Sequence, residues 1–149
     1  MHLLVCTPFF ANVSNIMKLG YIILYVPKVA DAVAFYEKAF GMTCRFRHGG
    51  EEGDYAEMQT GETVLAFASE TLADSHGFAY RKTSVSGDAP SIEIALVSED
   101  VAGAFDTAIT AGAIAVSQPA GKPWGQTVSY VRDNNGYLVE ICSPVGAAD

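Results

Sequence analysis

Basic side chains are scarce in this chain of 149 residues, which has nine Lys and Arg against 17 Asp and Glu and a formal charge of −8. Nucleic-acid phosphates require a basic face, so this balance argues against a nucleic-acid partner. It suits a cationic or amphipathic small-molecule ligand. The same negative charge is equally consistent with a compact protein in which acidity serves only to maintain solubility.

Long apolar runs are absent, and no segment of the sequence is long and apolar enough to cross a membrane. The apolar stretch at residues 2–10 is short, and no Lys or Arg precedes it. A secretory signal needs a basic start and a longer apolar core. We therefore expect a cytoplasmic protein with no membrane partner. Residues 1–16 are interpreted as an N-terminal extension ahead of a single domain at 17–149.

Cysteine is also rare, and Cys6, Cys44 and Cys142 are odd in number and far apart, with no C-x-x-C pair. This excludes a disulfide framework or a cysteine-based zinc site and fits reduced thiols in a cytoplasm. Cys44 and Cys142 fall in strand patterns, where a cysteine serves as a small core side chain.

What the chain does contain is one pattern written twice. The first copy opens with an apolar run at 19–26 and a helical pattern that Gly41 closes. The second opens with a run at 92–97 and a helical pattern that Gly112 closes. Short apolar strands follow each helix. The pattern predicts an α+β fold of two βαβββ modules, 17–89 and 90–145, related by a pseudo-twofold axis and forming curved mixed sheets around a pocket.

The remaining elements follow from alternation and turn residues. In the second module we expect a short strand at 113–116, a loop at 119–124 and a tight turn at 133–136. Residues 71–90 are the only long irregular stretch. They are interpreted as the linker between the modules and as a candidate flap over the pocket.

Side-chain alternation sorts the strand residues into two faces. The side chains on one face are large and apolar, as expected for a face that packs under a helix. They are Ile22, Leu24, Leu65, Phe67, Ile92, Ile94, Leu96, Val139 and Ile141. The other mixes small side chains, tyrosines and two carboxylates: Tyr21, Ile23, Tyr25, Val64, Ala66, Ala68, Glu93, Ala95, Leu138, Glu140 and Cys142.

The mixed face predicts a concave ligand site. Small residues leave space, aromatic rings offer flat surfaces, and carboxylates in an apolar lining are costly without a partner. The alternative is that Glu93 and Glu140 face solvent or pair with arginines. Aligning the two modules places Tyr21 opposite Glu93 and Ala66 opposite Glu140, so these four positions should converge across the pseudo-twofold axis.

Three segments resemble the vicinal oxygen chelate superfamily, which includes glyoxalase I, bleomycin-resistance proteins, fosfomycin-resistance enzymes and extradiol dioxygenases. They read YVP…AFYEKAFGM at 25–42, KPWGQ at 122–126 and YVRDNNGYLVE at 130–140. The resemblance covers about residues 17–144 and implies the fold. It does not define the reaction, because the superfamily hosts unrelated chemistries.

In the metal-dependent members of that superfamily, the four converging positions hold histidines and carboxylates. Here they are Tyr21, Ala66, Glu93 and Glu140, of which only Glu140 keeps the usual ligand type. Catalytic zinc needs three protein ligands, so no metal cofactor is expected, and two carboxylates alone would hold at most a weakly bound Mg²⁺ or Ca²⁺. His48 and His76 are expected in a turn and in the linker.

The resemblance is closest in character to the metal-free bleomycin-resistance type, acidic homodimers that hold bulky cationic or aromatic antibiotics in clefts built from both chains. It implies a small-molecule binding protein that acts in antibiotic resistance and performs no turnover. The expected ligand-binding residues are Tyr21, Tyr25, Phe46, Met58, Ala66, Glu93, Trp124 and Glu140. Trp124 would be a stacking platform or a plug at the dimer seam.

Two other functions stay open. A lyase, isomerase or dioxygenase could use a divalent metal, or acid–base catalysis, with Glu93 and Glu140 as the candidate catalytic residues. Acid–base catalysis needs no histidine, because one of two facing carboxylates in an apolar pocket can have its pKa raised toward neutrality and act as a general acid or base. The third reading is a structural or regulatory dimer with a filled cavity.

Overall fold

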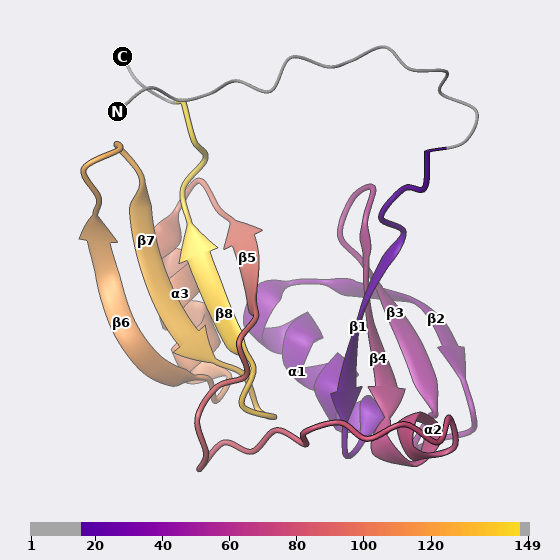
Figure 1. The fold of residues 1–149 in the computed structure, drawn as a ribbon. Coiled ribbons are helices and arrows are strands. Elements are labelled where there is room, and N and C mark those ends of the chain that lie inside the picture. The colour runs from indigo at the N-terminus through magenta and orange to yellow at the C-terminus, as the bar shows by residue number, and fades with distance from the viewer. Residues whose placement is uncertain (1–15, 147–149) are drawn as a thin grey trace.

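Each half of the chain forms its own four-stranded sheet in the computed structural model, which describes residues 16–146 (Figure 1). In the first sheet the order is β1-β4-β3-β2, with strands β1 (Tyr21–Val26), β2 (Thr43–His48), β3 (Tyr55–Gln59) and β4 (Val64–Ser69). In the second the order is β5-β8-β7-β6, with strands β5 (Glu93–Val97), β6 (Ile114–Gly121), β7 (Thr127–Arg132) and β8 (Leu138–Cys142). The N-terminal extension lies, apart from Ile16, outside the described residues.

The same mixed pairing recurs in both sheets. Strand β1 runs parallel to β4, β5 runs parallel to β8, and every other pair is antiparallel. The sequence-based prediction of an α+β fold with two βαβββ modules is therefore confirmed. Among the described residues the sheets do not close into a barrel.

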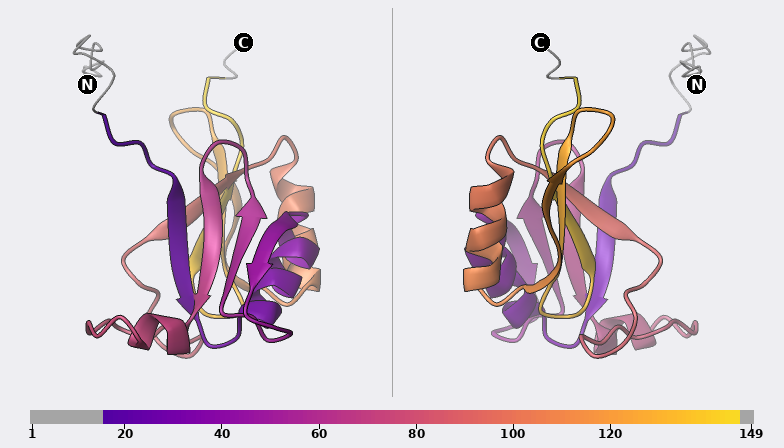
Figure 2. Two further views of the ribbon diagram at one scale, coloured as in Figure 1. Left: turned by 90° about the vertical axis from the view of Figure 1, so that its right-hand side faces the viewer. Right: turned by 90° about the vertical axis from the view of Figure 1, so that its left-hand side faces the viewer.

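One long helix backs each sheet, and both helices lie on the same side of the molecule (Figure 2). Helix α1 (Val29–Phe40) buries one stripe of side chains that includes Val29, Val33 and Tyr36. Gly41 caps its C-terminal end with a φ of 67°, a backbone conformation that residues with a side chain rarely adopt. Helix α3 (Val101–Thr110) begins at Asp100, whose carboxylate accepts a hydrogen bond from the Gly103 N–H.

A buried carboxylate joins the two modules. Asp133, in the turn between β7 and β8, is fully buried and accepts a hydrogen bond of 2.7 Å from the Tyr36 hydroxyl on α1. Its second oxygen accepts from the backbone N–H groups of Asn135 and Tyr137, each at 2.9 Å. Burial raises the pKa of Asp133, and these three hydrogen bonds oppose the rise.

Two local predictions were wrong. Strand β6 runs to Gly121, so residues 119–121 are not a loop. Pro119 is accommodated because β6 is an edge strand whose register shifts between Ser117 and Ala120. The second error concerns residues 71–74, which were expected to be irregular but belong to a short helix, α2 (Glu70–Asp74). The Ser69 hydroxyl caps this helix by accepting a hydrogen bond of 3.0 Å from the Leu72 N–H.

None of the helices within residues 16–146 has the length and apolar character needed to span a membrane.

Candidate functional site

The candidate site lies on the face of the two sheets that α1 and α3 leave uncovered, which we call the open face (Figure 2). Its members from the first sheet are Tyr21, Ile23, Tyr25, Val64, Ala66 and Ala68. Those from the second are Glu93, Ala95, Val97, Leu138, Glu140 and Cys142. Parallel pairing sets Ile23 beside Ala66 and Ala95 beside Glu140, so small and large side chains adjoin.

The half of the open face built by the first sheet carries aromatic rings over small residues. Ala66 and Ala68 are buried, whereas Tyr21 is 53% exposed. Tyr55 on β3 is paired with Ala68, and its ring centroid lies 6.3 Å from that of Phe46 on β2. Exposed rings around a floor of alanines give a surface on which a planar ligand can stack.

A polar group borders this aromatic surface. Glu57 accepts hydrogen bonds from the Tyr55 hydroxyl at 3.1 Å and from Arg45 Nε at 2.8 Å. Partial burial, together with Glu57, raises the pKa of Tyr55 to about 12. The sequence interpretation missed Tyr55 and Glu57, although the alternation of β3 with its apolar neighbours Ala56 and Met58 could have placed both on the open face.

The half built by the second sheet carries a pair of carboxylates on neighbouring strands. Glu93 begins β5 and Glu140 lies in the middle of β8. The hydroxyl of Tyr130, which is paired with Glu140 across β7 and β8, donates to Glu140 Oε2 at 3.2 Å. A shared hydrogen bond with Glu140 raises the pKa of Glu93, and partial burial and charge repulsion add to the rise.

These carboxylates also affect their neighbours. Burial and then the Glu140 carboxylate raise the pKa of the Cys142 thiol, and the same two causes raise the pKa of the Tyr130 hydroxyl. Cys142 is therefore held as an unreactive thiol rather than as a nucleophile. Tyr130 was missed by the sequence interpretation, although the alternation along β7 places it on the same face as Glu140.

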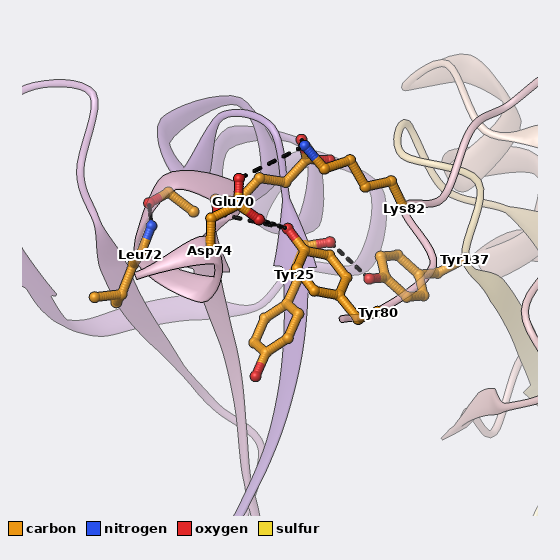
Figure 3. A network of polar contacts seen from close by, with 8 residues as sticks. Tyr25, Glu70, Leu72, Asp74, Tyr80, Lys82 and Tyr137 are labelled. Atoms are coloured by element: carbon orange, nitrogen blue, oxygen red, sulfur yellow. Dashed lines mark hydrogen bonds and ion pairs between the residues drawn. The ribbon is translucent and has the colours of Figure 1, made fainter. Parts of the chain in front are cut away.

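The linker, residues 75–90, is fastened against β1 at its first end (Figure 3). The Tyr25 ring stacks with Phe78 at 6.4 Å and meets Tyr80 edge-on at 5.0 Å. The Tyr80 hydroxyl donates to Asp74 at 2.9 Å, and Lys82 pairs with Glu70 on α2 at 3.3 Å. Partial burial and Asp74 raise the pKa of Tyr80 to about 12.

The other end of the linker is fastened to the second module by one arginine. Arg132 donates from Nη2 to the Ser84 carbonyl at 2.9 Å and from Nη1 to the Gly87 carbonyl at 2.5 Å. Nε and Nη2 also donate to the Gly136 carbonyl, at 3.0 and 2.8 Å. The linker is thus a strap held at both ends.

A family model described as the Glyoxalase/Bleomycin resistance protein/Dioxygenase superfamily matches residues 18–141. The chain belongs to this superfamily. A search of curated proteins gave no match.

Several solved structures share the fold. A glyoxalase-related enzyme from Fulvimarina pelagi is 22% identical over 89% of this chain and 94% of its own, with a TM-score of 0.73. TioX from Micromonospora sp. ML1 is 23% identical over 85% and 98%, with a TM-score of 0.65. A glyoxalase/bleomycin resistance protein/dioxygenase family enzyme from Burkholderia phytofirmans PsJN is 19% identical over 85% and 98%, with a TM-score of 0.67. At these identities the likeness concerns the fold alone.

The superfamily's metal positions do not fit a transition metal in this chain. Tyr21, Ala66, Glu93 and Glu140 supply one phenol, one methyl group and two carboxylates, whereas such a site takes imidazole together with carboxylate. Within residues 16–146 no three His, Cys, Asp or Glu side chains converge as a ligand group. That the protein works without a metal cofactor stays a prediction.

The other sequence-predicted ligand residues lie in three different settings. Phe46 is half-exposed at the β2 edge of the open face. Trp124, 63% exposed in the turn between β6 and β7, donates from Nε1 to Gln126 at 2.8 Å. Met58 does not line the open face: it is paired with Leu65 and fully buried in the core on the helix side. The prediction for Met58 is corrected because β3 alternation turns it away from Tyr55 and Glu57.

Proposed function

We propose that the protein binds a cationic aromatic small molecule on the open face and sequesters it without turnover. The observation that carries the proposal is the carboxylate pair Glu93 and Glu140 on the same face as the aromatic surface around Tyr21 and Tyr25. The carboxylates would hold the cation, and the rings would stack against the planar part of the ligand.

The electrostatics support a cation as the ligand. Hydrogen bonding to Glu140, then burial, and then the Glu140 charge raise the pKa of Glu93, so part of this rise is repulsion between the two carboxylates. A bound cation relieves that repulsion, and the formal charge of −8 attracts cations to the molecule. An antibiotic of this chemistry would make the protein a resistance factor, and the free thiols of Cys44 and Cys142 support a cytoplasmic location.

We further propose that the ligand is held between two copies of the chain. Large apolar side chains stand exposed on the open face, with Ile23 at 47%, Phe46 at 50% and Val97 at 67% exposure. Symmetric association would cover such a surface. Sedimentation is expected to show a homodimer at micromolar concentration, and a monomer alone would contradict this part of the proposal.

Ethidium, a planar aromatic cation, is a suitable probe for the site. Chelator-treated protein is expected to bind it saturably in a fluorescence titration. Glu140→Gln should raise the dissociation constant about tenfold, equivalent to about 1.4 kcal/mol. Glu51→Gln removes the same charge from the exposed turn after β2 and should leave binding unchanged. Equal affinity in the wild type and Glu140→Gln would contradict the proposal.

The pH dependence gives an independent check on Glu93. Because its pKa is raised, Glu93 becomes neutral on acidification before an ordinary glutamate does. Ethidium affinity should therefore fall as the pH drops through that raised pKa, and the Glu93→Gln variant should lack this step. A titration in which the two proteins have the same pH profile would exclude Glu93 from the site.

The same carboxylates support a second candidate, an enzyme that uses acid–base catalysis. A Glu93 that keeps its proton beside Glu140 and Tyr130 could act as a general acid while Glu140 acts as the base. A substrate screen should then find turnover that Glu140→Gln abolishes without loss of the folded state. Turnover that survives this substitution would end the enzyme hypothesis.

A further inference from the structure

Strands β1 and β5, which face each other across the gap between the modules, are only partly covered by helices. Helix α1 packs against β2, β3 and β4, and α3 packs against β6, β7 and β8. Strands β1 and β5 are the sheet edges that border the gap between the modules (Figure 1). Their helix-side residues Ile22, Ile94 and Leu96 are only half-buried, although strand alternation gives them the direction of core residues.

A cavity of about 730 Å³ occupies this gap. The helix-side residues of β1 and β4 form one wall, and the edge strand β5 forms the opposite wall. Phe40–Thr43, where the chain leaves α1, contribute a third side. A smaller cavity of about 360 Å³ adjoins it over the end of α1, sharing Phe40, Gly41, Leu96 and Val97.

The lining indicates the chemistry of an occupant. Large apolar side chains dominate the cavity: Ile22, Phe40, Met42, Leu65, Ile94 and Leu96. The uncharged polar side chains Thr43, Gln59, Thr60 and Thr63 cluster around the turn between β3 and β4 and the start of β2. Glu93 is the one charged residue in the lining. Water in such an apolar space has few hydrogen-bond partners, and the volume lies in the range of about 300–1,000 Å³ typical of small-molecule sites.

We propose that this cavity between the modules is a second ligand site, for a neutral hydrophobic molecule with one uncharged polar end. The apolar body lies between β1 and β5, and the polar end meets the threonines and Gln59. Walls on three sides favour a small molecule over a flat protein partner. Most of its large apolar side chains lie on the helix side of the sheets. Val64, Glu93, Ala95 and Val97 also belong to the open face, so this site adjoins the proposed cation-binding surface along β5.

Two neighbouring residues of β1 allow a matched test, because Ile22 faces the cavity and Ile23 faces the open side. N-phenyl-1-naphthylamine, a neutral apolar dye, is expected to bind the wild-type protein saturably with about one site per chain. Ile22→Trp fills the cavity and should raise the dissociation constant of the dye at least tenfold. Ile23→Trp, with the same added bulk, should leave that constant unchanged.

Controls separate this site from the open face. Met42→Trp, which fills the cavity from its third side, should also weaken dye binding at least tenfold and serves as the second variant if Ile22→Trp does not fold. Glu140 lies outside the cavity lining and distinguishes the two sites, so Glu140→Gln should leave the dissociation constant of the dye unchanged. Absence of saturable dye binding, equal affinities in the wild type and the folded cavity-filling variant, or a loss of dye affinity in Glu140→Gln as large as in Ile22→Trp would each overturn the second site. Loss of ethidium binding in Glu140→Gln, by contrast, bears only on the open face.

Discussion

Asp133→Ala is expected to lower the free energy of unfolding by roughly 3–9 kcal/mol, since each of three buried donors left without an acceptor costs about 1–3 kcal/mol. The donors are the Tyr36 hydroxyl and the backbone N–H groups of Asn135 and Tyr137. A domain of this size is stable by about 5–15 kcal/mol, so the variant should be close to unfolding at room temperature. Urea denaturation followed by circular dichroism measures the loss.

Two milder variants identify the cause. Tyr36→Phe removes only the hydrogen bond from the Tyr36 hydroxyl to Asp133 and should cost about 1–3 kcal/mol. Asp133→Asn keeps an oxygen acceptor for the backbone N–H groups and should cost less than Asp133→Ala. If Asp133→Ala and Asp133→Asn lose the same stability, the hydrogen bonds to Asp133 are not what joins the modules.

The pH dependence of Asp133→Asn has a definite sign. The folded-state pKa of Asp133 lies above its ordinary value of 3.8, so its contribution to stability is complete below that value and declines as the pH rises through the folded pKa. The stability difference between the wild type and Asp133→Asn should therefore be larger at low pH than at neutral pH. The reverse trend would mean that the hydrogen bonds lower the pKa of Asp133 by more than burial raises it.

Gly136→Ala is expected to lower the free energy of unfolding by roughly 2–6 kcal/mol and to release the strap. Gly136 has a φ of 91°, which costs a residue with a side chain about 1–3 kcal/mol. A Cβ atom there would lie 2.5 Å from the Ser84 carbonyl oxygen and 2.8 Å from Arg132 Nη2. This overlap adds about 1–3 kcal/mol and pushes the strap from the arginine that holds it.

Trypsin can report on the strap directly, because Arg81 and Lys82 lie within it. Cleavage at these residues should be faster in Gly136→Ala than in the wild type under native conditions. Gly61→Ala is the matched control: Gly61 has a φ of 95° and open space where its Cβ would lie. It should show the cost of the backbone conformation without faster cleavage in the strap, and equal cleavage in both variants would contradict the proposed role of Gly136.

Much of the fold could be predicted because it depends on short-range periodicity. The spacing of Val29, Val33 and Tyr36, with Gly41 behind them, defined α1 to the residue. Strand alternation also placed Glu93 and Glu140 on one face, where the structure has them on neighbouring strands. That this face binds a ligand stays a prediction.

The remaining features depend on contacts that have no local signature. Arg132 binds backbone carbonyls, and any segment of chain could supply those acceptors. Ile22 and Ile94 carry the pattern of core residues, but whether a helix covers them depends on how the modules pack together. Met58 was misplaced for a different reason, because it was assigned by its residue type although the alternation of β3 assigns it to the core.

Four consecutive strands build each sheet, and this arrangement has a consequence for synthesis on the ribosome. The first module has all its strands and its sheet partners once Asp74 has been made, whereas the buried partner of Tyr36 is not made until Asp133. At about 5–20 residues per second, the ribosome takes roughly 3–12 s to extend the nascent chain from Asp74 to Asp133. During this interval the first module has all the strands of its sheet, while the face of α1 that will pack against the second module is still exposed to solvent.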